Sequence, residues 1–152
     1  MNILAIDCGT KTGWASWSNG HLESGVHEFA VGRGESPGLR FLRFRSWLVD
    51  MLTMTGPGLV VYEQSHLRGG HATDLLVGMT TRVVEECAAR GIEYAAVHTA
   101  TLKKAATGSG KADKRAMIEA ASKRWGKRPV DDNEGDALCL LAWAEKTLGG
   151  RA

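Results

Sequence analysis

The chain has 152 residues, 43% of them hydrophobic and 24% charged, which predicts one globular domain over residues 1–152 and excludes a fibre or a disordered chain. No apolar run approaches the roughly 18 residues of a membrane span, and the sequence enters a strand without a signal-peptide pattern. Three widely spaced cysteines fit neither a disulfide framework nor a Cys-x-x-Cys metal site. We therefore expect reduced thiols and a cytoplasmic protein without a membrane partner.

Strand patterns dominate the N-terminal part of the chain. Residues 2–6 form a short apolar run, which ends at the carboxylate of Asp7. Alternating large and small residues over 14–17 predict a second strand, and residues 21–31 predict a third. Because residues 19–20 are Asn-Gly, a favoured hairpin turn, we expect an antiparallel three-stranded meander.

A helix and a second acid-terminated strand follow. Apolar residues at near-helical spacing predict a helix over residues 39–54. Its basic residues are expected on a solvated face: Arg40, Arg43 and Arg45. Residues 59–62 then form a buried strand that ends at Glu63. Because parallel strands place their carboxyl ends at one edge of a sheet, Asp7 and Glu63 are expected to face one another.

The next part of the chain contains two predicted helices and a fifth strand. After a glycine-rich loop over residues 65–71, a helix is predicted over 72–90 and a strand over 92–97. Glycines predict irregular structure in the segment 98–110. A second amphipathic helix is predicted over 111–125.

The last predicted helix opens with the sequence DDNEGD. Asp131 and Glu134 fit a capping box, and acids in a first helical turn are favoured by the helix dipole. Asp136 lies a full turn inside the helix, where capping does not account for it. Asp132 and Asn133 share its helical face, which therefore presents two carboxylates and an amide.

Basic residues concentrate in one segment. Residues 101–128 carry nine lysines and arginines against two acids, a net charge of +7 in a chain whose net charge is +2. This excess is typical of a polyanion-binding face, and a solvated lysine-rich helix has the same composition. The candidate nucleic-acid contacts are Lys103, Lys104, Lys111, Lys114 and Arg115 in this segment, with His66 and Arg68 in the 65–71 loop.

Three acids from separated parts of the chain form a candidate metal site: Asp7, Glu63 and Asp136. Their hard oxygen atoms suit Mg²⁺ or Mn²⁺ and not Zn²⁺, whose His and Cys ligands are absent here in any ligand spacing. Two such cations can activate water and stabilise a leaving oxygen in phosphodiester cleavage. Together with the basic segment, the acids predict a nuclease.

Four motifs, in order along the chain, resemble one family: Ile6-Asp7-Cys8-Gly9-Thr10, Tyr62-Glu63-Gln64, Ala112-Asp113-Lys114 and Gly135-Asp136-Ala137-Leu138. Over nearly the whole chain the sequence resembles the RuvC-type Holliday junction resolvases of the RNase H-like superfamily. The resemblance implies an α/β, RNase H-like fold with a five-stranded mixed sheet flanked by helices. It also implies a homodimer that makes symmetric nicks in four-way DNA junctions, with two Mg²⁺ ions per active site and Mn²⁺ as a substitute.

The resemblance also implies roles for single residues. The metal ions would be bound by Asp7, Glu63 and Asp136. Lys114 would lie near the scissile phosphate. The family's fourth ligand lies three residues before the last Asp, at Asn133; either its amide oxygen coordinates, or Asp132 takes the role. We favour Asp132 because a second carboxylate better offsets two divalent ions. Family members often carry an aromatic wedge after the second acid, where this chain has His66 and Leu67.

Other readings of the same residues remain open. The RNase H-like nucleases that process ribosomal RNA precursors share the Asp-x-Gly-Thr-Lys start and would act on RNA, and forked DNA is a further substrate class. If Asn133 disables the site, the chain would be a junction-binding module without cleavage. The sugar kinase, heat-shock and actin superfamily shares the Asp-x-Gly-Thr pattern, but it needs two such domains and 152 residues are too few.

Overall fold

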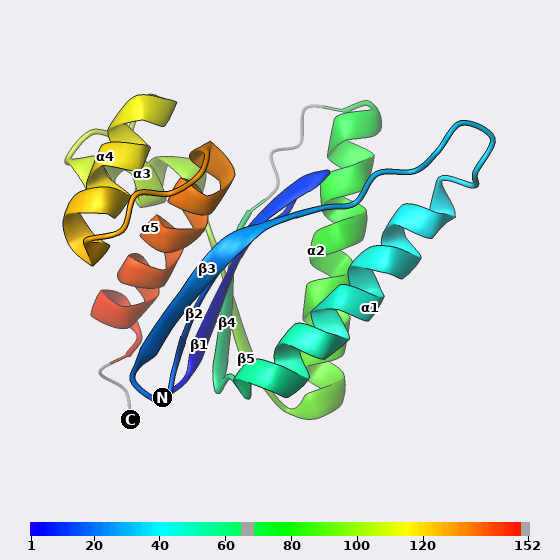
Figure 1. The fold of residues 1–152 in the computed structure, drawn as a ribbon, viewed down its shortest axis with the longest axis horizontal. Coiled ribbons are helices and arrows are strands. Elements are labelled where there is room, and N and C mark those ends of the chain that lie inside the picture. Colours follow the sequence, from blue (N-terminus) through cyan, green and yellow to red (C-terminus); the bar gives the residue numbers. More distant parts are fainter. Residues whose placement is uncertain (65–68, 150–152) are drawn as a thin grey trace.

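The computed structural model describes residues 1–64 and 69–149, which form a five-stranded sheet with helices on both sides (Figure 1). The strands are β1 (Ile3–Asp7), β2 (Lys11–Ser18), β3 (His21–Glu28), β4 (Leu59–Glu63) and β5 (Glu93–Val97). Their order in the sheet is β3-β2-β1-β4-β5. The first three strands are antiparallel, and β4 and β5 extend the sheet parallel to β1. The predicted mixed α/β sheet and its N-terminal meander are confirmed.

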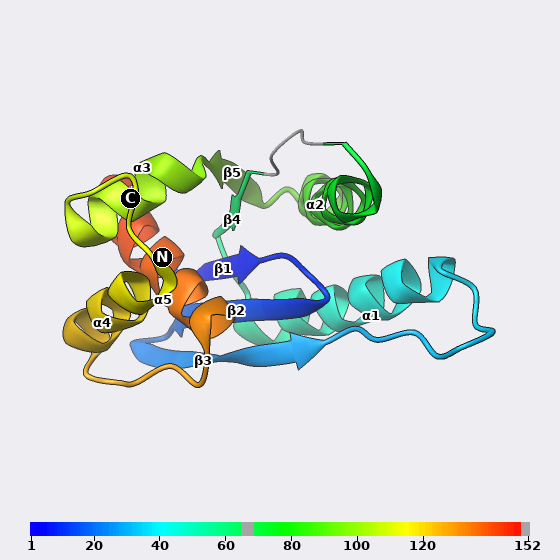
Figure 2. The ribbon, with the colours of Figure 1, turned by 90° about the horizontal axis from the view of Figure 1, so that it is seen from above.

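Two groups of helices cover the sheet (Figures 1 and 2). One group contains α1 (Gly38–Thr55) and α2 (His71–Arg90), and the other contains α3 (Thr99–Thr107), α4 (Lys114–Trp125) and α5 (Asp132–Thr147). In the part of the chain that the structure describes, no helix is long and apolar enough to cross a membrane.

The alternation of side chains along β1 and β4 divides the core into two clusters. Facing α5 are Ile3, Ala5, Leu59 and Val61. Facing α1 and α2 are Leu4, Ile6, Val60 and Tyr62. Asp7 and Glu63 end these strands two residues after Ala5 and Val61, so their side chains project to the same face, toward α5. Because Ile6 pairs with Tyr62 in the parallel ladder, the two acids that follow lie side by side.

Several predicted boundaries differ from the structure, and β2 begins three residues earlier than predicted, at Lys11. β3 ends at Glu28, although the N–H of Phe29 still donates to the carbonyl of Thr10, opposite it in the register, at 2.7 Å. The segment predicted as irregular contains α3, a short helix whose one buried side chain is Leu102 and which ends before the glycines. α4 begins three residues late, since Asp113 is its N-cap and accepts a hydrogen bond from the Ala116 N–H at 2.8 Å.

Arg43 and Arg45 of α1 are exposed, as predicted, and Arg40 is half-buried, but all three also bind partners that the sequence did not predict. Arg40 donates from Nε to the carbonyl of Phe29 at 2.8 Å, and Arg45 donates from Nε to Glu86 at 2.8 Å. Arg43 forms an ion pair with Glu35 in the loop that precedes the helix. These guanidinium groups hold neighbouring segments against α1, a role that spacing along one helix does not reveal.

Candidate metal centre

The three predicted acids meet at the carboxyl edge of the sheet. Asp7 ends β1, Glu63 ends β4, and Asp136 lies one turn inside α5. One carboxylate oxygen from each lies within 4.8 Å of the other two, and all three side chains are half-buried. Residues separated by more than a hundred positions in sequence therefore form one cluster of oxygen ligands.

Burial and the proximity of like charges raise the pKa values of two of the carboxylates in this cluster. Burial and the charges of Asp136 and Glu63 raise the pKa of Asp7 well above its usual range. Burial, Glu63 and Asp132 raise the pKa of Asp136 to about 7, against the opposing effect of Lys103 and Lys114. Without a cation, the cluster therefore retains protons at pH values where separate carboxylates would be ionised.

This arrangement fits a divalent cation. Three carboxylates within one coordination sphere supply the hard oxygen donors that Mg²⁺ and Mn²⁺ prefer, and the nearby ammonium groups only partly offset their charge. A bound cation would relieve the repulsion that raises both pKa values. Asp7, Glu63 and Asp136 are the residues that would hold it.

Close packing brings the N-terminus of α5 to the sheet. A methyl group built on Gly13 of β2 would lie 1.9 Å from the carbonyl oxygen of Asn133, so only glycine permits this approach. Asp131 caps the helix and accepts a hydrogen bond from the Glu134 N–H at 2.9 Å. Gly13 and the cap at Asp131 therefore both fix where the N-terminus of α5 meets the sheet.

Glu134 does not complete the capping box that the sequence predicted. Its side chain is 1% exposed and accepts hydrogen bonds from the Ser24 hydroxyl and the Val130 N–H, each at 2.7 Å. Lys127 forms an ion pair with the same carboxylate at 3.2 Å. These partners lower the pKa of Glu134 despite its burial. Glu134 thus fastens α5 to β3 and stands apart from the acidic cluster.

The two candidates for a fourth ligand are differently placed. Asp132 is paired with Lys114 at 3.4 Å, and its charge contributes to the raised pKa of both Asp7 and Asp136. The Asn133 amide instead donates to the Asp131 carboxylate at 3.2 Å. Asp132 therefore acts electrostatically on the cluster, whereas the Asn133 side chain is engaged in the cap.

One contact of the site was missed by the sequence analysis. The hydroxyl of Thr99, the first residue of α3, donates a hydrogen bond to the Glu63 carboxylate. Glu63 pairs with Val97 in the parallel ladder, so a hydroxyl two residues beyond that strand end falls beside the acid. A Thr directly after a predicted neighbouring strand was the available signal, but the prediction of irregular structure there concealed it.

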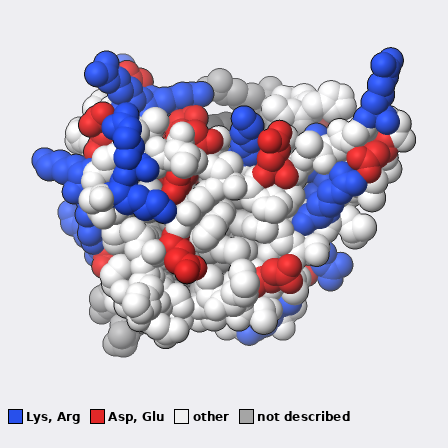
Figure 3. All heavy atoms as spheres, in the orientation of Figure 1, with Lys and Arg blue, Asp and Glu red and all other residues white. Residues whose placement is uncertain are grey.

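Two of the predicted basic contacts, Lys103 and Lys114, lie close enough to the acids to lower the pKa of Asp136. Lys103 and Lys104 lie on α3, Lys111 precedes α4, and Arg115 follows Lys114 at the start of α4. All except Lys103 are exposed. His66 and Arg68 lie outside the described residues. Figure 3 shows lysine and arginine side chains gathered over the α3 and α4 side of the molecule, with acidic groups beside them.

The sheet order, the helices on both faces and the acids at the strand ends define an RNase H-like fold. No protein-family model matches the sequence, and no curated protein matches it. Comparison with solved structures, however, finds proteins with the same fold.

The first is RuvC of Thermus thermophilus, with 21% identity, a TM-score of 0.75, and 96% of each chain covered. The complex of T. thermophilus RuvC with a Holliday junction substrate matches at 21% identity and a TM-score of 0.79, over 99% of this chain and 96% of that one. The yeast mitochondrial Holliday junction resolvase Ydc2 matches at 8% identity and a TM-score of 0.59, over 97% and 82%. The chain thus has the RuvC fold along nearly its whole length.

Proposed function

We propose that this chain is a Holliday junction resolvase, a divalent-cation-dependent endonuclease that nicks four-way DNA symmetrically. The observation that carries the proposal is the convergence of Asp7, Glu63 and Asp136 on a chain with the fold of RuvC, a protein solved in complex with a Holliday junction substrate. Residues 1–152 would act as a single nuclease domain. A cytoplasmic location is consistent with this activity.

The acids would hold two Mg²⁺ ions, with Mn²⁺ as a substitute. Such cations supply Lewis-acid stabilisation of the phosphoryl oxygens and lower the pKa of water near the phosphorus. The charges of both Asp136 and Glu63 raise the pKa of Asp7, so all three acids would act as ligands of one metal centre. Asp132 suits the fourth position because its charge already acts on Asp7 and Asp136, while the Asn133 amide serves the helix cap.

The lysines near the acids would bind the scissile strand. The ammonium groups of Lys103 and Lys114 lower the pKa of Asp136, so both lie within electrostatic reach of the cluster. Lys114 has an 83% exposed side chain, so it is able to meet a phosphate and stabilise charge that develops during cleavage. Lys104, Lys111 and Arg115 extend this basic surface toward the flanking backbone.

A homodimer would account for symmetric cleavage. Two nicks at related positions across a junction require two active sites related by the two-fold symmetry of the DNA. One chain contains one acidic cluster among the residues that the structure describes. Two copies would therefore supply the second site.

The proposal is tested with a labelled synthetic four-way junction, incubated with the protein in Mg²⁺, Mn²⁺ or EDTA. Linear duplex, forked DNA and structured RNA of matched sequence run beside it. The variant Asp7→Asn removes one metal ligand, and Asp50→Asn is the matched control, because Asp50 is an exposed acid on α1 far from the cluster. We expect paired, metal-dependent nicks confined to the junction, lost in Asp7→Asn and kept in Asp50→Asn.

Each other outcome has a definite meaning. Cleavage of RNA or forked DNA in preference to the junction would support the acidic site as the catalytic centre but show that the junction is not the substrate. Junction binding without cleavage in any metal would identify a junction-recognition module. Cleavage that survives both EDTA and Asp7→Asn would refute the metal centre.

A further inference from the structure

The loop between β3 and α1, residues 29–37, leaves the sheet at the edge that carries the acids. β3 runs parallel to β1, with β2 antiparallel between them, so the two strands end at the same side. The Phe29 N–H donates to the carbonyl of Thr10, in the turn that follows Asp7, at 2.7 Å. The loop then extends away from the body of the protein, on the side opposite α3 and α4 (Figures 1 and 2).

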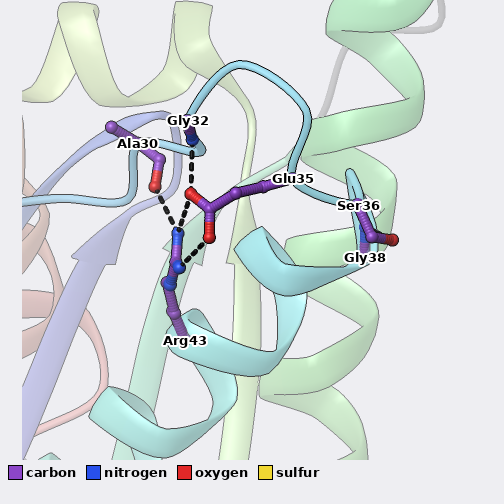
Figure 4. A network of polar contacts seen from close by, with 6 residues as sticks. All are labelled: Ala30, Gly32, Glu35, Ser36, Gly38 and Arg43. Carbon is purple, nitrogen blue, oxygen red and sulfur yellow. Dashed lines mark hydrogen bonds and ion pairs between the residues drawn. The ribbon is translucent and has the colours of Figure 1, made fainter.

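A polar clamp holds this exposed loop in one shape (Figure 4). The Glu35 carboxylate accepts hydrogen bonds from the Gly32 N–H at 2.5 Å and from Arg43 Nη2 at 2.5 Å. Arg43 also donates to the Ala30 carbonyl at 2.9 Å. The hydrogen bond from Arg43 holds the pKa of Glu35 below its usual range. The clamp therefore fixes the loop and cancels the charge of its one acid.

Arg33 is the charged residue of the loop that the clamp does not use. It is exposed, and it makes no hydrogen bond or ion pair with any residue of 1–64 or 69–149. Lys11, at the start of β2 on the same edge, is also exposed, although Glu28 lies opposite it in the ladder and offsets part of its charge. Figure 3 shows basic side chains on the side where the loop extends, separate from those over α3 and α4.

We propose that the 29–37 loop is a preorganised arm that contacts the phosphate backbone of the nucleic acid through Arg33, on the far side of the acids from the lysines of α3 and α4. The inference rests on the proposed nuclease function and deepens it. Cations on both sides of the acidic cluster define a path for the substrate across the sheet edge. An ordered arm meets a phosphate at a lower entropic cost than a disordered one, which accounts for an exposed loop being clamped from within.

The test measures junction binding by fluorescence anisotropy in EDTA, where cleavage is suppressed, over a series of KCl concentrations. The variants are Arg33→Ala, Arg33→Lys and the matched control Lys146→Ala. Lys146 is an exposed cation in the last turn of α5, the end of that helix that points away from the acids. Circular dichroism and thermal unfolding establish that each variant is folded.

For Arg33→Ala we expect weaker binding and a slope of log K against log salt that is smaller by about 0.9 for each copy of the chain bound. Arg33→Lys should keep most of the slope, because the charge remains, and Lys146→Ala should match the parent protein. An unchanged slope and affinity in Arg33→Ala would refute the role of the loop in binding. If the parent protein cleaves junctions, the proposed function would still hold. A parent protein that neither binds nor cleaves junctions would instead refute the proposed function.

Discussion

Replacing Asp136 by Asn should make the metal-free protein more stable while it abolishes cleavage. In the folded chain this carboxylate is half-buried beside Glu63 and Asp7, and burial with the neighbouring charges raises its pKa to about 7. Asparagine is nearly isosteric with aspartate and carries no charge. The substitution therefore removes repulsion from the folded state and one ligand from the site.

The magnitude follows from the linkage between proton binding and folding. Between its ordinary pKa of 3.8 and the folded value of about 7, the native protein holds a proton on Asp136 that the unfolded chain releases. The free energy of unfolding therefore falls as pH rises through this window, by at most roughly 4 kcal/mol from this group. We expect Asp136→Asn to gain about 2–4 kcal/mol at pH 8 and little at pH 4, which is about 5–12 °C in Tm for a chain of this size.

Thermal and urea unfolding in EDTA at pH 4, 6 and 8 measure this effect, with Asp50→Asn as the control for loss of one surface charge. Added Mg²⁺ should stabilise the parent protein and leave Asp136→Asn nearly unchanged, because binding to the folded state alone raises stability. If Asp136→Asn is no more stable than the parent at pH 8 in EDTA, the acids do not repel one another as argued.

Three further predictions concern the placement of the site. Gly13→Ala should lower the free energy of unfolding by about 1–3 kcal/mol, because its methyl group overlaps the Asn133 carbonyl; an unchanged Tm would show that α5 does not pack this closely. Thr99→Val should raise the Mg²⁺ concentration for half-maximal cleavage about 10–100-fold, and Thr99→Ser should restore it; equal loss in both would contradict a hydrogen bond that orients Glu63. Asp132→Asn should reduce metal affinity in calorimetric titration by at least about tenfold, whereas Asn133→Ala should change it little, and the reverse order would assign the fourth ligand to Asn133.

The placement of Asp7 and Glu63 was predictable from sequence because it depends on local rules. Each acid ends an apolar run, strands of such composition pair in parallel, and the period of two fixes the face to which a strand-end side chain points. Asp136 was found for a related reason: a charged residue one turn inside an apolar helix is not explained by capping. These positions follow from the order of neighbouring residues along the chain.

Other features depended on contacts between distant segments. The sequence predicted solvated arginines on α1 but not the partners on other segments that Arg40, Arg43 and Arg45 bind. It predicted a capping role for Glu134, which is instead buried against Ser24. Hydrogen-bond partners across 110 positions leave no periodic trace in a sequence, because any of several acceptors would satisfy the same donor.

The sequence by itself thus determined the sheet, its two strand-end acids and the acid of the last helix, since strand and helix periodicity require only local order. Only the tertiary structure decided that the Thr99 hydroxyl meets Glu63, that the Asn133 amide turns to the cap, and that Glu35 clamps the loop of Arg33. Those contacts depend on the exact approach of α5, α3 and α1 to the sheet. Side-chain packing sets that approach, and packing is a property of the whole fold.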